Sequence, residues 1–530
     1  MSKKLTAILV AMVMLSTIMV GCGQSAQPQA SSTVVAQASS SVAAPAGNGG
    51  SKDPVKIVHY FKPVTDGNEQ SDPEAMKTIH DLILNDTGAD IEILYGSKND
   101  DDHTTKLNLL LSSNQQVDIF EESWQPLYVK GFLADLTDVI AAEPTAQEAL
   151  AQFKDETIAG VKVNGRMMAF PYNDAGSTYP VWLRQDLLDK CGLQKPKTID
   201  ELENVLKVFK EKDPIGGGKT MGLVTSAEGL RKAFMGGFTE NGDGRFMSAD
   251  GNITPYFLNP GYKNFVQKMA NWYKAGLIAP ETFSYNRTNI VEFIRKGQVA
   301  SFAEWYSMVT LSYKQFKDAF PEGEYTYIDG LTGEKGLCES IWPVIKPSVN
   351  ERAAGVMCVN ARTADIPTAV KVLAWGYLNN SQNFLTAFQG VENIGWKWVD
   401  KSTKTYELIK DPSQKYLGEY NMYMSLVNEL NVNSLDPERL FHNKWLKEGW
   451  FRYDKAKWSA DKTTMYDNQA LKDNIPNYVE IMNVVQEEMI KFIIGSRPMS
   501  DWDNYTKTLE SMSTNKMVAE FTRQYKELSK

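Results

Sequence analysis

Short apolar runs alternate with helical patterns along the first part of the folded chain. Val55 to Phe61, Asp90 to Tyr95 and Val117 to Phe120 have the composition of strands, and helical spacing covers about Pro73 to Asn85 and His103 to Leu111. Strands that alternate with helices predict an α/β fold, in which a parallel sheet has crossover helices on its faces. Ligands of such sheets bind beyond the carboxyl ends of the strands.

The predicted strand ends carry aromatic and polar residues. Tyr60 and Phe61 end the first strand, and Glu122, Ser123 and Trp124 follow the third. Aromatic rings can stack on the apolar faces of a sugar, while carboxylates and hydroxyls bind its hydroxyl groups. We therefore expect these five residues to contact a ligand. For Trp124, a position as a lid over the core is the alternative.

The chain is too long for one core. About 480 residues follow Gly50, whereas a single hydrophobic core stops growing at about 250–300 residues. Two lobes are therefore expected, and the first crossing between them should follow the predicted hairpin that ends at Pro171. Asn164-Gly165 supplies the turn of this hairpin, which requires positive φ angles. Tyr172, Asn173 and Asp174 then act in the hinge, in ligand binding or in both.

Further candidate ligand contacts come from later segments. Glu304 and Trp305 directly follow the strand predicted from Val299 to Phe302, so the sequence favours a ligand role for them. Trp182 lies in the middle of a strand, Trp342 near the second expected crossing, and Trp396 in a loop or strand. For these three residues a core position and a ligand contact both remain open.

The N-terminus has the pattern of an export signal. Lys3 and Lys4 precede the uncharged apolar run Leu5 to Val20, which is shorter than a membrane-spanning helix, and Met19-Val20-Gly21-Cys22 follows. This pattern resembles the lipobox of bacterial lipoproteins, which implies cleavage after residue 21 and a lipid on Cys22. A secretory signal with an incidental cysteine is the alternative. Residues 22–52 are rich in Ser, Ala, Gln and Gly, and we expect a flexible tether.

Composition and motifs argue against several other functions. The net charge of −9 does not suit nucleic-acid binding, and the four histidines are scattered, so we expect neither a metal nor another cofactor. The chain has no Gly-x-Ser-x-Gly motif. Glycoside hydrolysis by a pair of carboxylates remains an open alternative, because the separation of the two groups depends on the fold.

Cys338 and Cys358 either pair across neighbouring strands or remain buried thiols, and we favour the buried thiols.

Several segments resemble, in order, the motifs of family 1 extracellular solute-binding proteins. These segments are Gln116-Val-Asp-Ile-Phe120, Gly131-Phe-Leu-Ala-Asp-Leu-Thr137, Asn164-Gly-Arg-Met-Met-Ala-Phe-Pro171, Leu183 to Gly192, Pro196 to Glu201, Gly276-Leu-Ile-Ala-Pro280 and Lys296-Gly-Gln-Val-Ala300. The tail around Ile494-Gly495 and Asp501-Trp-Asp-Asn-Tyr505 resembles the longer LplA-like lipoprotein branch.

The resemblance implies a two-lobed, hinged fold of the periplasmic-binding-protein type II, with a ligand cleft between the lobes. We expect lobe 1 to contain residues 53–172 and about 353–393, and lobe 2 to contain residues 173–352 and about 394–500. A C-terminal helix is expected over residues 501–530. The implied protein is not an enzyme: it is a monomer that captures an oligosaccharide outside the cell and delivers it to an ABC permease, and it touches the membrane only through its lipid anchor. A secreted carbohydrate-active enzyme and a binder of peptides or other solutes are the alternatives.

One loop departs from the family pattern. Asp213-Pro-Ile-Gly-Gly-Gly-Lys-Thr-Met-Gly222 stands where many relatives have a loop that resembles a calcium site. Calcium takes 6–8 oxygen ligands, and Ile215, Gly216 and Gly217 offer no side-chain oxygen. We therefore predict that this loop binds no calcium.

Overall fold

The computed structural model describes residues 53–62, 73–97, 99–113, 115–174, 176–177, 179–339, 341–342, 356–409, 423, 425–449 and 466–528. All of them belong to one compact unit, Asp53–Lys530. The signal peptide, Cys22 and the tether lie outside the described residues. Within the described part of the chain, no helix combines the length and apolar character that crossing a bilayer requires.

The first sheet has five strands in the order β2-β1-β3-β17-β6. They are β2 (Ala89–Tyr95), β1 (Val55–Phe61), β3 (Ile119–Glu121), β17 (Val356–Val359) and β6 (Phe170–Pro171). The strands β1, β2 and β3 are parallel, as the alternating pattern predicts, and β17 runs antiparallel to β3 and β6. The α/β class is therefore confirmed, with strands of both directions in one sheet.

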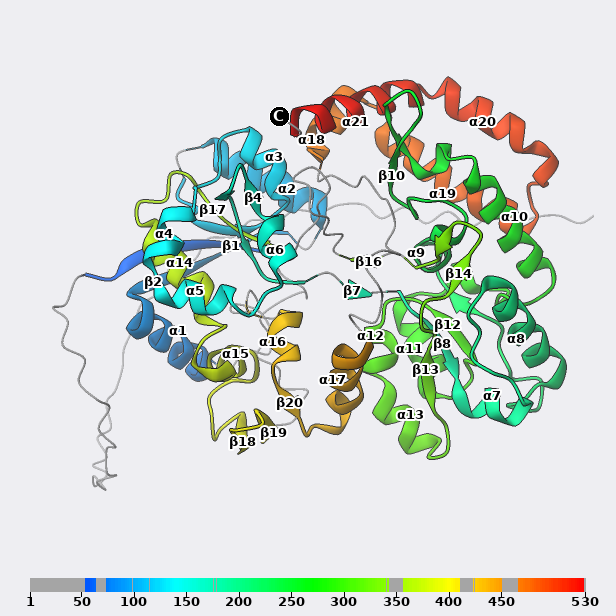
Figure 1. Cartoon of the computed structure of the whole chain (residues 1–530), viewed down its shortest axis with the longest axis horizontal. Helices are drawn as coiled ribbons and strands as arrows, with labels where there is room; N and C mark the ends of the chain where they lie inside the picture. Colours follow the sequence, from blue (N-terminus) through cyan, green and yellow to red (C-terminus); the bar gives the residue numbers. More distant parts are fainter. Residues whose placement is uncertain are drawn as a thin grey trace, which may run out of the picture. The chain divides into compact units, whose positions relative to one another are not determined.

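Helices surround the first sheet (Figure 1). They include α1 (Pro73–Thr87), α2 (Asp100–Ser112), α5 (Pro144–Leu150) and α14 (Ile366–Trp375). The apolar face of each helix packs into one core with the strands. Because α1 and α2 connect successive parallel strands, they are the crossover helices that the sequence predicts. The shorter helices of this region are α3 (Trp124–Val129), α4 (Thr137–Ala142) and α6 (Asp155–Gly160).

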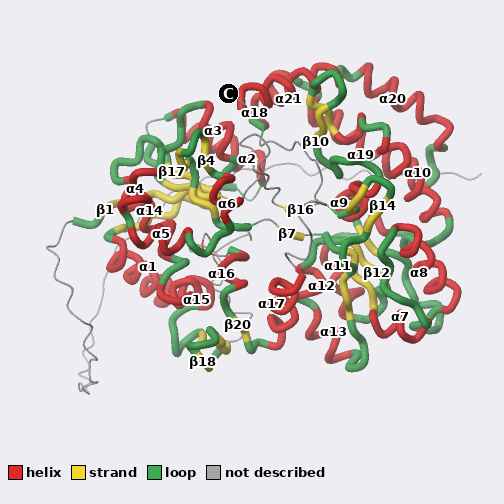
Figure 2. The backbone as a smooth tube through the Cα atoms, in the orientation of Figure 1, coloured by secondary structure: helices red, strands yellow, loops and turns green. Residues whose placement is uncertain are grey.

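The second sheet has four strands in the order β13-β8-β12-β9. They are β13 (Tyr325–Tyr327), β8 (Val181–Arg184), β12 (Ser301–Ala303) and β9 (Val224–Thr225). The strands β12 and β9 are parallel, and β8 is antiparallel to both of its neighbours. Figure 2 shows these strands in yellow among red helices.

The second sheet has separate cores from the first. Its helices include α7 (Gln185–Cys191), α8 (Ile199–Lys212), α9 (Ala227–Phe234) and α10 (Gly261–Lys274). Thr198 caps α8 by accepting a hydrogen bond from the Glu201 N–H, as the sequence predicts. The long helix α19 (Tyr478–Ile494) packs against α10.

Two chain segments that connect the sheets pair with each other. The strand β7 (Gly176–Ser177) lies between β6 and β8 in the sequence, and β16 (Ile341–Trp342) precedes β17. The two strands form an antiparallel ribbon. A third connection runs from β19 (Thr405–Leu408) through residues that are not described to α16 (Leu426–Leu430), β20 (Asn433–Ser434) and α17 (Pro437–Gly449).

The remaining elements complete the two regions. They are β4 (Lys162–Val163), β5 (Arg166–Met167), β10 (Arg245–Met247), β11 (Ile253–Pro255), α11 (Arg287–Arg295), α12 (Ser307–Thr310), α13 (Tyr313–Ala319), β14 (Thr332–Gly333), β15 (Gly336–Leu337), α15 (Gln382–Gln389), β18 (Trp396–Asp400), α18 (Asn468–Asn474), α20 (Trp502–Ser511) and α21 (Thr514–Leu528). The hairpin β4–β5 has the predicted turn, with φ angles of 50° at Asn164 and 80° at Gly165.

Two expectations about local structure have a clear outcome. The C-terminal region is not one helix, because Ser513 has a φ angle of 64° and separates α20 from α21. Cys338 and Cys358 are buried and unpaired, as favoured from the sequence. Burial raises the pKa of both thiols, so they remain protonated at neutral pH.

Candidate ligand-binding site

The parallel strands β1, β2 and β3 end at one edge of the first sheet, which we call edge 1. Glu121 ends β3 and is exposed there, and Glu122 and Ser123 follow it. Tyr172, which follows β6, donates a hydrogen bond of 2.5 Å from its hydroxyl to Glu121 Oε1. Glu122 accepts hydrogen bonds from the Thr104 hydroxyl, at 2.7 Å, and from the Ser123 N–H, at 2.8 Å. Edge 1 therefore presents carboxylates beside a half-buried tyrosine.

The parallel strands β9 and β12 end at one edge of the second sheet, which we call edge 2. Ser226 follows β9 and Glu304 follows β12. The Ser226 N–H donates a hydrogen bond of 2.8 Å to Glu304 Oε1. The Ser226 side chain accepts one from the Gly229 N–H and caps α9. Burial raises the pKa of Glu304, and these hydrogen bonds to the carboxylate partly offset that effect.

An aromatic pair lies at edge 2. Trp305 is half-buried, and its ring meets the Tyr179 ring edge to face, with centroids 5.6 Å apart and planes at 85°. Lys232 Nζ lies 5.7 Å from the Tyr179 ring centroid. Burial and the nearby carboxylates Glu228 and Glu304 raise the pKa of Tyr179, so its hydroxyl remains a hydrogen-bond donor. Trp305 leaves part of an aromatic surface exposed beside hydrogen-bonding groups.

Side chains of α17 pack against the segment that contains Trp305. Tyr306, next to Trp305, stacks on Trp445 with centroids 4.5 Å apart and planes at 13°. The Thr310 hydroxyl lies 2.7 Å from His442 Nδ1, and His442 Nε2 lies 3.0 Å from Glu429 Oε2. These contacts fix α12 and α17 to each other and hold the Trp305 segment in place.

The chain connects the two edges directly. Pro171 ends β6 beside Val356 of β17, and β17 pairs with β3 so that Met357 faces Glu121. At edge 2, Val181 at the start of β8 pairs with Ala303 at the end of β12. Only residues 172–180 separate Pro171 from Val181, so the connection spans at most about 35 Å. The segment that connects the two edges is therefore short.

Five of the residues selected from the sequence lie at one or the other of these edges. Glu122, Ser123 and Tyr172 lie at edge 1, and Glu304 and Trp305 lie at edge 2. Four other residues are in the cores: Tyr60, Trp124, Trp182 and Trp396 are each no more than 1% exposed. These four side chains therefore have no exposed surface for a ligand.

Each of these four aromatic residues is held by its core neighbours. The Tyr60 ring stacks on His103, with centroids 4.4 Å apart, and Trp396 donates a hydrogen bond to the Gly390 carbonyl. Trp124 packs in the core of the first sheet and Trp182 in a core of the second. For Trp124, Trp182 and Trp396 the core was one of the positions left open from the sequence, and the structure places them there. Tyr60 was expected only as a ligand contact, because the end of a strand does not reveal toward which face a side chain points.

The remaining candidates have other surroundings. Phe61 is 5% exposed and contacts Tyr95 edge to face. Asp174 is buried and accepts hydrogen bonds from the Thr157 hydroxyl and the Lys154 N–H, which fixes the start of the crossing to α6. Asn173 is also buried. The backbone of Trp342 lies in β16, and its side chain is outside the description.

Sequence reasoning missed Tyr179 and Ser226. Tyr179 precedes β8, and its place at edge 2 follows only from the antiparallel pairing of β8 with β12. Ser226 follows β9, a strand of two residues that is too short to be detected from a periodic pattern. The available signal was that Ser is a preferred residue at the start of a helix: Ser226 caps α9 by accepting a hydrogen bond from the Gly229 N–H.

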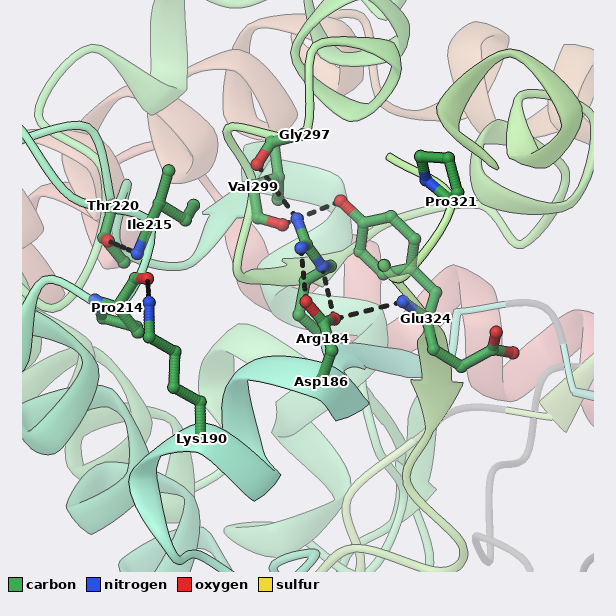
Figure 3. Close-up of polar contacts among 12 residues, drawn as sticks. Arg184, Asp186, Lys190, Pro214, Ile215, Thr220, Gly297, Val299, Pro321 and Glu324 are labelled. Carbon is green, nitrogen blue, oxygen red and sulfur yellow. Dashed lines mark hydrogen bonds and ion pairs between the residues drawn. The ribbon is translucent and has the colours of Figure 1, made fainter. Parts of the chain in front are cut away.

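The loop at residues 213–220 holds itself together through Asp213. Its carboxylate accepts hydrogen bonds from the Gly218 N–H, at 2.6 Å, and from the Thr220 N–H and hydroxyl, at 3.0 and 2.6 Å. Figure 3 shows Lys190 donating to the Pro214 carbonyl and Thr220 accepting from the Ile215 N–H. The hydrogen bonds to its carboxylate lower the pKa of Asp213 to about 2.

The same view shows how β8 is fixed. Arg184 is buried and donates to both carboxylate oxygens of Asp186 and to the Gly297 carbonyl (Figure 3). Tyr325 donates to the Val299 carbonyl at 2.7 Å.

A surface pocket of about 600 Å³ is lined by Leu193 to Lys197 and the first turns of α8. It contains none of the residues of edge 1 or edge 2.

The chain belongs to the bacterial extracellular solute-binding proteins, since the model of that family matches residues 70–383. Among curated relatives, the fructooligosaccharide ABC transporter substrate-binding protein FusA of Streptococcus pneumoniae is 24% identical over 385 residues, 64% of this chain and 63% of FusA. The polygalacturonan/rhamnogalacturonan-binding protein YtcQ of Bacillus subtilis is 28% identical over 26% of this chain and 28% of YtcQ.

Lipoprotein LipO of Bacillus subtilis is 27% identical over 33% of this chain and 34% of LipO. Each match therefore spans less than two thirds of the relative's length. The matches to these three relatives cover less of the chain than the matches to solved structures do.

Solved structures share the fold. The extracellular solute-binding protein from Bifidobacterium longum subsp. infantis superposes with a TM-score of 0.63 at 18% identity, over 90% of this chain and 99% of that one. The N-glycan transport solute-binding protein NgtS of Streptococcus pneumoniae gives a TM-score of 0.60 at 17% identity, with the same coverage. The predicted two-lobed, periplasmic-binding-protein-like fold is confirmed, as is the family.

Proposed function

We propose that this protein captures an oligosaccharide outside the cell and delivers it to the permease of an ABC importer. The observation that carries the proposal is the partly exposed indole of Trp305 at edge 2, which is held against the buried Tyr179 ring and has the exposed Glu228 nearby. Rings stack on sugars, and the neighbouring carboxylates accept hydrogen bonds from sugar hydroxyls. FusA and YtcQ, two binding proteins of oligo- or polysaccharides by name, support this ligand class.

The proposed mechanism is closure without chemistry. We propose that lobe 1 comprises residues 53–172 and about 353–393 together with Tyr423 and α16, because Tyr423 and Val427 belong to the core of the first sheet; this corrects the expected assignment of all residues after 393 to lobe 2. Residues 173–352 and the described chain from α17 onward form lobe 2, with the β7–β16 ribbon between the lobes. A ligand that contacts edge 1 and edge 2 together stabilises the closed arrangement, because it binds that state more tightly than the open one. The closed monomer is then the form that the permease subunits recognise, and no bond in the sugar is made or broken.

Isothermal titration of the purified protein with a panel of oligosaccharides and peptides tests this function. We expect an oligosaccharide to bind and to be recovered intact, and Trp305→Ala to weaken its binding at least about tenfold, or 1.4 kcal/mol. Trp398→Ala is the matched control, since Trp398 is a half-buried tryptophan on β18, outside both edges. Cleavage of the sugar would indicate a carbohydrate-active enzyme, and binding of peptides alone would indicate a different solute class.

We further propose that a lipid on Cys22 tethers the protein to the outer face of the cell membrane. The Met19-Val20-Gly21-Cys22 motif and the similarity to LipO, a lipoprotein by name, support this proposal. Cells that express the natural chain should incorporate labelled palmitate into it, whereas Cys22→Ala should abolish the labelling and release the protein into the medium. Labelling that persists in the Cys22→Ala variant would contradict the proposal.

A further inference from the structure

Both sheet edges are rich in carboxylates. Glu121 and Glu122 lie at edge 1, whereas Glu304 at edge 2 is buried. Glu228, in the first turn of α9, is exposed near Tyr179. A fixed negative charge repels a second one most strongly where water is partly excluded, because screening by solvent is weaker there. Carboxylates at these edges therefore disfavour a ligand that carries negative charge.

Carboxylates lie close to a tyrosine at each edge. Glu121 accepts the hydrogen bond of the Tyr172 hydroxyl and, after burial, is the main cause of the raised pKa of Tyr172. At edge 2, Glu228, Glu304 and Asp243 all contribute to the raised pKa of Tyr179. Carboxylates therefore lie near the Tyr179 ring that contacts Trp305.

The described cations near the edges have partners. Lys232 Nζ lies 3.7 Å from Asp243 Oδ2, and Arg231 Nε lies 3.9 Å from the same oxygen. Lys106 donates a hydrogen bond of 3.0 Å to the Tyr95 carbonyl at the end of β2. Lys62, which follows β1, also has an interaction partner. An arginine fork directed at a sugar carboxylate is therefore not seen among the described residues of either edge.

We propose that the two edges select oligosaccharides without carboxylate or sulfate groups. The inference rests on the proposed function, since it concerns the ligand of the same site. An uncharged sugar donates its hydroxyl hydrogens to Glu121, Glu122 and Glu228, whereas a uronate or sulfated sugar brings a second negative charge to each of them. Stacking on Trp305 does not depend on that charge, so the carboxylates provide the discrimination.

Matched probes separate charge from shape. Oligogalacturonates and their methyl esters have the same length and nearly the same outline, and only the acids are charged. Titrations of the full chain with these pairs and with neutral fructo-, manno- and gluco-oligosaccharides should give an uncharged best ligand. For any oligomer that binds in both forms, we expect the acid to bind at least about tenfold more weakly. The difference should shrink between 20 mM and 500 mM salt, because salt screens the repulsion.

Variants connect the discrimination to these residues. Glu121→Gln and Glu228→Gln keep the shape of each side chain and remove its charge, so both should bring the affinities for acid and ester closer together. Glu510→Gln, on the exposed side of α20, is the control and should leave the ratio unchanged. An acidic oligosaccharide that binds as tightly as its ester, or a ratio that does not respond to salt, overturns the inference and leaves the proposed function standing. Binding of no oligosaccharide at all overturns both.

Discussion

Lys130 and Asp467 form an ion pair between the two halves of the protein, with 2.5 Å between Nζ and Oδ2. Lys130 directly follows α3, next to the first sheet, and Asp467 caps α18, whose core residues belong with the second. The helix α21 also contacts α3. This pair therefore opposes a change in the arrangement of the two halves.

Removing the ammonium group should loosen this contact without unfolding either half. Lys130→Met keeps the apolar part of the side chain, and we expect a change in unfolding free energy below about 1 kcal/mol, because the pair is partly exposed. If the pair holds the closed arrangement, oligosaccharide affinity should fall two- to fivefold, with faster ligand release. Lys77→Met, which removes an exposed ion pair within α1, is the control. Equal affinities of both variants would show that the contact does not influence closure.

Trp445 should be essential for the position of Trp305. Its indole is 1% exposed and stacks on Tyr306. Trp445→Ala should lower the unfolding free energy by about 3–5 kcal/mol, because it leaves a large cavity. The milder Trp445→Phe variant should stay folded and still weaken oligosaccharide binding. Denaturant unfolding and calorimetry measure the two effects, and a Trp445→Phe variant with unchanged affinity would separate the stack from the site.

His59 should make the fold sensitive to acid. Its ring is buried, and burial together with the nearby His103 lowers its pKa from 6.5 to about 3. Between these two values the unfolded chain binds a proton that the folded chain does not, so stability falls as the pH drops from about 6.5 toward 3. The loss from this group is up to about 5 kcal/mol, at 1.4 kcal/mol per pH unit.

His59→Gln removes this titration and should flatten the dependence of the unfolding free energy on pH over that window. His80→Gln, which changes a partly buried histidine of α1, is the control. Because acidic groups such as Glu203 and Glu520, with pKa values of about 2, also lose stabilising contacts in acid, the comparison between the two variants is decisive. Parallel pH curves for both would contradict the role of His59.

The loop at residues 213–220 should be indifferent to calcium. Its carboxylate already accepts hydrogen bonds from backbone and hydroxyl donors. Neither calcium nor a chelator should shift the melting temperature of the protein by more than about 1 °C. Asp213→Ala should lower it, because those donors lose their acceptor and because Asp213 has a φ angle of 40°. Asp213→Asn should lower it less, since Asn also accepts hydrogen bonds and tolerates positive φ. A calcium-dependent rise in the natural protein would refute this prediction.

Long elements with clear periodicity could be predicted from the sequence. The strands β1 and β2, the helices α1 and α8 and the Asn164-Gly165 turn all appear where their patterns indicate. Strands of two or three residues, such as β6, β7, β9 and β16, carry no usable period, so the pairing of the crossing segments could not be predicted. The same limit hid Ser226 and Tyr179.

The candidate site could be predicted only in part. Reasoning from strand ends selected Glu122, Tyr172, Glu304 and Trp305, which lie at the two edges. It also selected Trp124, which is buried because the first turn of α3 directs the indole into the core. The direction of a side chain depends on the turn that follows a strand, and no local pattern in the sequence specifies that turn.

The place of β17 in the first sheet has a consequence for how the polypeptide is made. This strand lies between β3 and β6, yet it begins at Val356, nearly 300 residues after Phe61 at the end of β1. A ribosome must therefore synthesise most of the second sheet before the first can close its hydrogen bonds. Until Val356 to Val359 have been synthesised, no strand can join β3 to β6, so the first sheet remains incomplete during much of translation.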